Sequence, residues 1–143
     1  MIQKLRERSA GESGFTLVEL LVVMLILGLL AAIAIPSFFN QRDKARDADA
    51  KASTRTAQTA METYATDNDG SYAAATPAGL QNIEETLTDV VALAVTSTAD
   101  TYTVTVDSET GNDFSISRTA GGTTTYGCNA GGDAGCPTGR NWG

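Results

Sequence analysis

Glu19 is the residue best placed for specific chemistry, because it is the one charged residue in an apolar stretch that runs from Phe15 to Ile35. At about 1.5 Å per residue, a helix over this stretch would be about 31 Å long, close to the hydrocarbon thickness of a bilayer. A carboxylate within such a span costs on the order of a few kcal/mol, so its default interpretation is functional. The sequence therefore predicts that Glu19 meets a cation.

The segment before the apolar stretch provides a candidate for that cation. Residues 1–14 are polar and weakly basic, and Lys and Arg before a span favour a cytoplasmic N-terminus. The sequence changes abruptly from polar to apolar between Gly14 and Phe15. Cleavage there would give Phe15 a free α-amine one helical turn before Glu19, where it could face the carboxylate of a neighbouring subunit.

The stretch Gly14-Phe15-Thr16-Leu17-Val18-Glu19 resembles the cleavage motif of type IV pilins and pseudopilins, and the resemblance extends over about residues 1–72. It implies that a membrane prepilin peptidase cuts after Gly14 and methylates Phe15. It also implies that Glu19 pairs with the N-terminus of an adjacent subunit and sets the register of assembly.

Two residues are expected to weaken the apolar helix. Pro36 crowds the carbonyl of Ala32 and donates no N–H, which predicts a kink or a loosened turn. Gly28 weakens the helix further upstream. Both positions match those at which the pilin family often has Gly and Pro, and the resemblance implies that residues 28–36 melt and extend as subunits pack.

Two simpler interpretations of the segment remain open. Glu19 lies near the cytoplasmic end, so a plain membrane anchor could hold its carboxylate among the lipid headgroups. A secretory signal would instead use Leu20–Leu30 as its apolar region and Ala32-Ile33-Ala34 as its cleavage site. The signal interpretation leaves the Gly14–Glu19 motif unexplained, and we favour pilin-like processing.

The composition limits what else the chain can do. The 143 residues suffice for one small domain and an anchor, and the absence of His excludes catalytic triads and metal sites that require it. We find no catalytic constellation and expect neither enzymatic activity nor a cofactor. The net charge of −7 does not favour nonspecific attraction to nucleic acid, so binding of nucleic acid is retained only as a possibility.

The helix is predicted to continue beyond the apolar stretch, from about Thr16 to about Asp67, because the following residues favour helix. The spacings Asp47→Lys51 and Asp43→Arg46 suit ion pairs along a solvated helix. A seam of mostly small side chains is expected to lie against a sheet. The seam consists of Ala45, Ala48, Ala52, Thr56, Ala60 and Tyr64.

The remainder of the chain indicates a small β head. Alternation predicts strands near Tyr102–Val106 and Phe114–Ser117, and a third strand over Thr123–Cys128. Thr76-Pro77 could open a short helix, whereas Asp89–Val95 is ambiguous between helix and strand. The predicted fold is α+β, with a long N-terminal helix packed on an antiparallel meander of three or four strands.

The two cysteines, Cys128 and Cys136, enclose a glycine-rich loop. In an exported domain they are most simply a disulfide, and two thiols alone make a poor zinc site. Many type IV pilins also enclose a C-terminal loop with a disulfide. Trp142, the only Trp, is expected to cap the core in preference to an exposed, adhesive position.

Four segments are thus predicted. They are a leader (1–14), a transmembrane or filament-core helix (15–36), an amphipathic continuation (37–68) and a β head (69–143). The resemblance implies a pilin that waits in the inner membrane and then forms a surface homopolymer, served by prepilin peptidase, an assembly platform and an ATPase. A pseudopilin of a secretion or DNA-uptake machine, and a monomeric anchored binding domain, are the alternatives.

Overall fold

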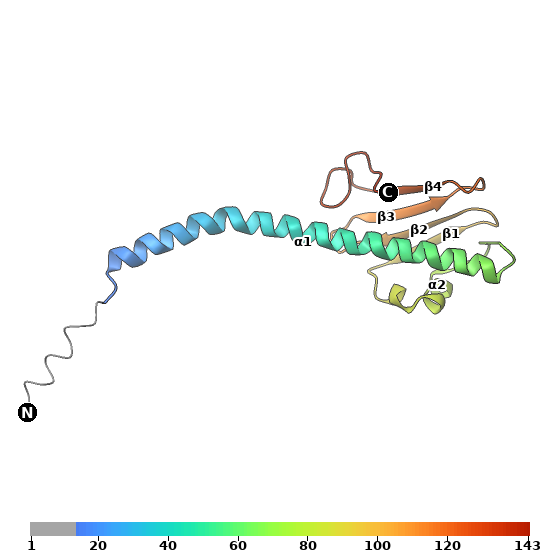
Figure 1. Ribbon diagram of the computed structural model, residues 1–143, viewed down its shortest axis with the longest axis horizontal. Helices are drawn as coiled ribbons and strands as arrows, with labels where there is room; N and C mark the ends of the chain where they lie inside the picture. The colour runs from blue at the N-terminus through green and yellow to red at the C-terminus, as the bar shows by residue number, and fades with distance from the viewer. Residues whose placement is uncertain (1–13) are drawn as a thin grey trace, which may run out of the picture. The chain divides into compact units, whose positions relative to one another are not determined.

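The computed structural model describes residues 14–143 and divides into two compact units that meet between Phe38 and Phe39 (Figure 1). The predicted leader lies outside the described residues, apart from Gly14. Helix α1 (Leu17–Asp67) contributes to both units, and its bounds agree with the predicted helix to within a residue. We describe each unit by itself.

The first unit is the apolar half of α1. Its large side chains from Leu17 to Ile35 are exposed, and by length and composition this is the one helix of residues 14–143 that could cross a membrane. The helix continues through Gly28 and Pro36 without interruption. Melting of this segment concerns the assembled state and stays a prediction.

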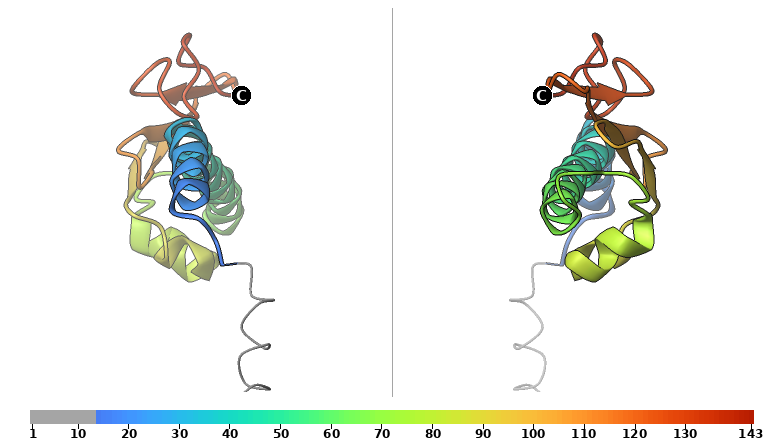
Figure 2. Two further views of the ribbon diagram at one scale, coloured as in Figure 1. Left: turned by 90° about the vertical axis from the view of Figure 1, so that its left-hand side faces the viewer. Right: turned by 90° about the vertical axis from the view of Figure 1, so that its right-hand side faces the viewer.

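The second unit is the head, in which four antiparallel strands form a meander of order β1-β2-β3-β4. The strands are β1 (Leu93–Ser97), β2 (Tyr102–Asp107), β3 (Asp113–Arg118) and β4 (Thr124–Cys128). Figures 1 and 2 both show the second half of α1 lying against one face of this sheet. The predicted α+β fold is therefore confirmed.

Alternation in β2 and β3 creates the buried face of the sheet. Every second residue from Tyr102 points inward, and Val104 and Val106 lie opposite Ile116 and Phe114 in the register. The inward side chains pack against α1, where Ala57 and Met61 have no exposed surface. Small and flexible helix residues thus allow the strands to approach closely.

The seam predicted to face the sheet is wrong for its first half. Ala45, Ala48 and Ala52 are exposed. The helix instead buries Asp47, Ala50, Thr54, Ala57, Ala60, Met61 and Ala65. A shift of two residues turns a helix by about 200°, so the true face lies nearly opposite the expected one at this end. The prediction fails here because the buried face of the helix includes a charged residue, Asp47, which a search for small and apolar side chains passes over.

The connection from α1 to the sheet contains two short helices, α2 (Pro77–Ile83) and the 3-10 helix η3 (Glu85–Thr88). The Thr76 side chain accepts a hydrogen bond from the N–H of Gly79 at 3.1 Å, which confirms the predicted N-cap. Leu80 and Leu87 fill the core from this connection. The ambiguous stretch, Asp89–Val95, lies after η3 and resolves into a short loop and the start of β1.

Candidate assembly site and the buried carboxylate network

The predicted processing and assembly residues lie together at the start of α1. Phe15 lies two residues before the start of the helix and is 76% exposed, and Gly14 is exposed as well, so the Gly14–Phe15 bond is accessible in this chain. The hydroxyl of Thr16 accepts a hydrogen bond from the N–H of Glu19 at 3.1 Å, and this N-cap fixes the first turn of the helix. Glu19 is exposed in that turn, where the helix dipole favours an anion. Its pairing with another subunit stays a prediction.

Sequence reasoning missed the best-defined polar site, which is centred on Asp47. Its carboxylate has no exposed surface. It accepts hydrogen bonds from Ser108 Oγ (2.6 Å), Thr110 Oγ1, Asn112 Nδ2 (2.7 Å) and the N–H of Gly135 (2.8 Å). The helix is thereby tied to the β2–β3 turn and to the loop between the cysteines.

Four hydrogen bonds keep Asp47 ionised in this buried position. Burial alone would raise the pKa of its carboxyl, but the bonds from Ser108, Thr110, Asn112 and Gly135 outweigh burial and hold the pKa below its ordinary value. Among residues 14–143, no Lys or Arg forms an ion pair with this carboxylate. Asp47 is thus a hydrogen-bonded anion that holds neighbouring segments in place.

The predicted ion pair between Asp47 and Lys51 is wrong. Lys51 Nζ instead donates to the carbonyl of Gly135 at 2.6 Å. Asp47 therefore accepts a hydrogen bond from the N–H of Gly135, and Lys51 donates one to the C=O of the same residue. Both side chains thus bind the cysteine loop. The predicted Asp43–Arg46 pair is present at 3.9 Å, and Arg46 makes a shorter contact of 3.0 Å with Glu109.

A second carboxylate network joins α1 to the opposite end of the sheet. Glu62 accepts hydrogen bonds from the hydroxyls of Tyr72 (2.7 Å) and Tyr102 (2.9 Å), and Arg118 Nη1 lies 3.7 Å from it. Burial, together with the bond to Glu62, raises the pKa of both tyrosines, so their hydroxyls remain donors. Sequence reasoning missed this network too.

The C-terminal segment is held against β4. Cys128 and Cys136 form the predicted disulfide, and the N–H of Cys128 donates to the carbonyl of Arg140 at 3.0 Å. Trp142 is half-buried; its Nε1–H donates to the carbonyl of Gly127 at 2.7 Å, and the edges and faces of its ring meet those of Phe114 and Tyr126. The core interpretation of this Trp therefore agrees with the structure.

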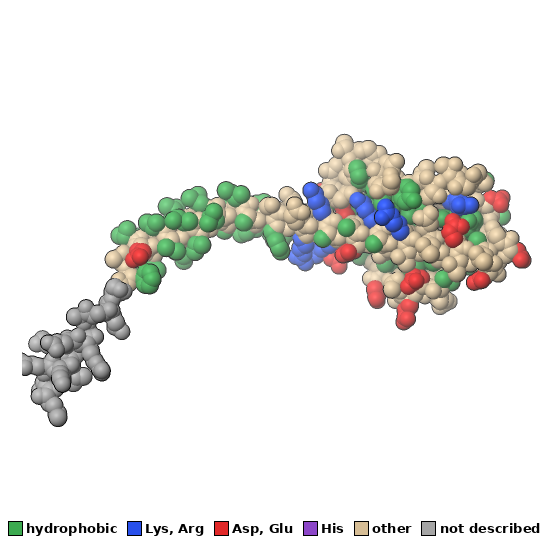
Figure 3. Space-filling model, viewed as in Figure 1, with side chains coloured by type: hydrophobic (Ala, Val, Ile, Leu, Met, Phe, Trp, Pro, Cys, Tyr) green, Lys and Arg blue, Asp and Glu red, His purple; other side chains and the backbone are tan. Residues whose placement is uncertain are grey.

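The Trp142 ring also has cations on its helix side. The guanidinium of Arg55 lies 5.3 Å from the ring centroid and Lys51 Nζ lies 6.0 Å from it. Such contacts are attractive, and they fix the position of long side chains that would otherwise be mobile. This part of α1 thus presents positive charge beside an aromatic ring. Figure 3 shows the blue Lys and Arg side chains gathered along this part of the helix.

A long, apolar N-terminal helix that continues against a small antiparallel sheet, with a cleavage motif at its start, defines a type IV pilin-like subunit. Residues 9–35 match the family model for the prokaryotic N-terminal methylation motif. Residues 36–138 match the model described as type IV minor pilin ComP, DNA uptake sequence receptor. This match covers more than half of the chain, which therefore belongs to that family of type IV pilins.

Individual relatives resemble this chain over a shorter length. It is 40% identical over 57 residues to the type II secretion system core protein G of Pseudomonas aeruginosa, covering 40% of each chain. It is 39% identical over 56 residues to the type IV major pilin PilA of Myxococcus xanthus, covering 39% of this chain and 26% of the relative. The competence protein ComGC of Halalkalibacterium halodurans is 34% identical over 58 residues, or 41% of this chain and 57% of the relative.

The chain thus matches less than two thirds of the length of each of these relatives. No solved structure matches it.

Proposed function

We propose that this protein is a structural, non-catalytic subunit that polymerises into an extracellular type IV pilus after cleavage between Gly14 and Phe15. The observation that carries the proposal is the position of Glu19, a lone carboxylate in an exposed apolar helix, one turn after the residue that cleavage would make N-terminal. Before assembly the helix anchors the subunit in the cytoplasmic membrane. Prepilin peptidase, an assembly platform and an ATPase are the machinery that this route requires.

Assembly replaces one set of contacts of the apolar helix by another. In the membrane its side chains contact lipid, whereas in the fibre they contact the helices of other subunits, so little apolar surface need meet water. Glu19 exchanges headgroups or water for the Phe15 amine of a neighbour, and an ion pair in such a dry environment depends strongly on both partners. The hydrogen-bonded head then faces solvent.

Replacement of Glu19 tests the proposal. Glu19→Ala and Glu19→Val should abolish or strongly reduce the fibres recovered by shearing, as counted by electron microscopy, while the subunit still accumulates in the membrane. Glu85→Ala is the matched control, because Glu85 is an exposed carboxylate in the head. Normal fibre yield from the Glu19 variants would contradict the pairing.

Electron microscopy also separates the alternatives. A pilus subunit gives long surface fibres at native expression, a pseudopilin gives fibres only when overexpressed, and a monomeric anchored domain gives none. The mass of the secreted chain provides a second test, since we expect it to begin at a methylated Phe15. A chain that begins at Ile35 would show that a signal peptidase acts instead.

A DNA-uptake role is the second candidate, because the family model that covers residues 36–138 is described as a receptor for the DNA uptake sequence. The feature of this chain that favours it is the pair of cations, Lys51 and Arg55, beside the Trp142 ring. Phosphate contacts from Lys and Arg, combined with an aromatic surface, suit DNA. The overall charge of −7 opposes nonspecific attraction, so binding should be local and sensitive to salt.

Substitution of Arg55 tests this second role. Full-length protein carrying Arg55→Gln should bind labelled duplex DNA more weakly than the wild type, and its affinity should depend less on salt. Arg140→Gln is the control, because Arg140 is exposed and lies outside the helix. Equal affinity of the wild type and Arg55→Gln for DNA would contradict a DNA-binding role of this site.

A further inference from the structure

The charges of the head are separated along the chain. All five Lys and Arg residues of α1 lie between Arg42 and Arg55. The next 62 residues, 56–117, contain ten acidic residues and no Lys or Arg. Three aspartates are interspersed among these five cations, but the part of α1 that follows Arg55 carries only acidic charges, so the two ends of this half of the helix differ in charge.

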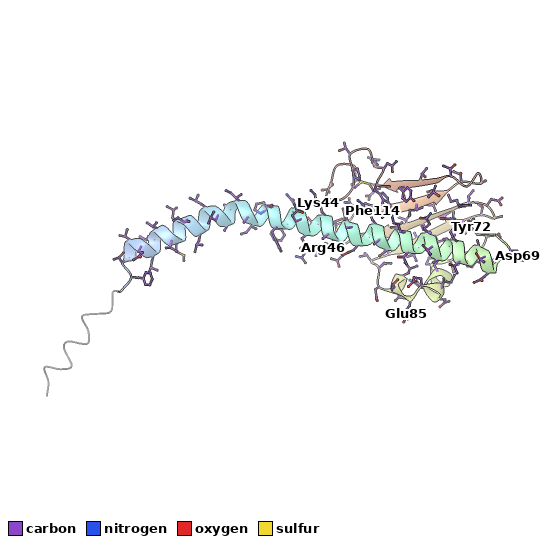
Figure 4. All side chains as sticks on the ribbon, in the orientation of Figure 1. Lys44, Arg46, Asp69, Tyr72, Glu85 and Phe114 are labelled. Atoms are coloured by element: carbon purple, nitrogen blue, oxygen red, sulfur yellow. A yellow bond between two sulfur atoms is a disulfide. The ribbon has the colours of Figure 1, made fainter. Side chains whose placement is uncertain are left out.

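In space the separation holds along α1 itself, whereas Glu109 of the β2–β3 turn returns to the basic end and Arg118 lies beside Glu62 towards the other end. Figure 4 shows Lys44 and Arg46 at one end of the head part of α1 and Asp69 at the other, with Glu85 on the connection that follows. Twenty-three residues separate Lys44 from Asp67 in the helix, which corresponds to about 35 Å. Figure 3 shows most of the blue side chains gathered at the first end, with some red ones among them, and further red side chains spread towards the second.

The charges at the two ends are largely unpaired within one subunit. Arg42 and Lys44 are exposed and form no ion pair with another described residue, whereas Arg46 contacts both Asp43 and Glu109. At the other end Asp67 is exposed in the last turn of α1, which has no basic residue. The helix dipole disfavours an anion there, so a cation from outside would relieve an existing repulsion.

We propose that a second copy of this chain supplies that cation, so that Arg42 and Lys44 of one head contact Asp67 and Asp69 of another. The two heads would be displaced along the helix direction by about 35 Å, the separation of the charged ends. The inference rests on the proposed polymerisation, which supplies identical copies whose basic and acidic ends are complementary. Its consequence is that the heads, as well as the apolar helices, determine the subunit register.

Charge reversal and charge exchange in the full-length protein test the contact. Arg42→Glu with Lys44→Glu should lower the yield of sheared fibres by about tenfold or more, because like charges then meet. Asp67→Lys with Asp69→Lys should lower it similarly, and a cation at position 67 suits the dipole at the end of α1. Asp69 has a φ of 54°, so thermal unfolding of this variant is measured beside its fibre yield to show that the head is folded. The variant with all four changes should recover most of the yield. Arg140→Glu is the control and should assemble normally.

The outcomes separate this inference from the proposed function. If the wild-type protein forms no fibres, polymerisation itself fails. If the wild type forms fibres and either double variant assembles equally well, the head contact is wrong while the pilus assignment stands. Failure of the fourfold variant to recover, or loss of DNA binding without loss of fibres in Arg42→Glu with Lys44→Glu, also overturns the contact. Recovery in the fourfold variant supports it.

Discussion

Gly135 lies against the buried carboxylate of Asp47, to which its N–H donates a hydrogen bond of 2.8 Å. A Cβ atom on Gly135 would approach the Asp47 Cβ to 2.5 Å, closer than two carbon atoms can pack. The residue beside Cys136 must therefore be Gly for the cysteine loop to meet α1. The Asp47 carboxylate thus links the cysteine loop, the helix and the β2–β3 turn.

Gly135→Ala should destabilise the head by about 2–4 kcal/mol, because the added methyl group forces the loop away from Asp47 and breaks the N–H bond. Urea unfolding of the full-length protein, followed by fluorescence of the single Trp142, measures the loss. Gly139→Ala is the matched control, since a Cβ there meets nothing within 4 Å. Equal stabilities of the two variants would show that the loop adjusts freely.

Asp47→Asn should lower the unfolding free energy at pH 7 by about 2 kcal/mol, because an amide replaces the charged acceptor and its NH₂ group faces existing donors. The pKa of Asp47 is depressed in the folded state, so its contribution is present above the ordinary carboxyl pKa of about 3.9 and is lost as the pH falls through the folded value.

Unfolding measured in steps from pH 7 to pH 2 checks this sign. The difference between the wild type and Asp47→Asn should shrink as the solution becomes acidic, whereas Asp49→Asn, which changes an exposed residue, should show little difference throughout. A difference that is constant with pH would mean that Asp47 does not carry a charge in the folded protein.

The sequence predicted the long helix, the meander and the disulfide because each leaves a local pattern. Apolar length, alternation in Tyr102–Val106 and the cysteine spacing can all be read within a few residues. The Asp47 site joins residues about 60 and 90 positions apart, and a charged side chain gave no local sign of burial. One clue was available: Ser108, Thr110 and Asn112 place short donors at every second position of a turn.

The disulfide should contribute about 2–3 kcal/mol, because the chain it closes is short. Cys128→Ser with Cys136→Ser removes it, and the same measurement in urea gives the loss. The structure also predicts that the disulfide and the Gly135–Asp47 contact depend on each other, because Gly135 lies in the loop that the disulfide closes. In the Cys-free background, Gly135→Ala should cost at least about 1 kcal/mol less than in the wild type. Additive losses would show that the loop reaches Asp47 without the disulfide.

Trp142 should stabilise the head through two separable contributions. Trp142→Phe keeps a ring against Phe114 and Tyr126 but leaves the Gly127 carbonyl without the indole donor, so we expect a loss of about 1 kcal/mol. Trp142→Ala also removes the ring from the half-buried site and should cost about 2–3 kcal/mol. Thermal unfolding followed by circular dichroism compares the variants without relying on Trp fluorescence. If Trp142→Ala were as stable as Trp142→Phe, the ring would add nothing beyond its hydrogen bond, and the C-terminal segment would not be part of the core.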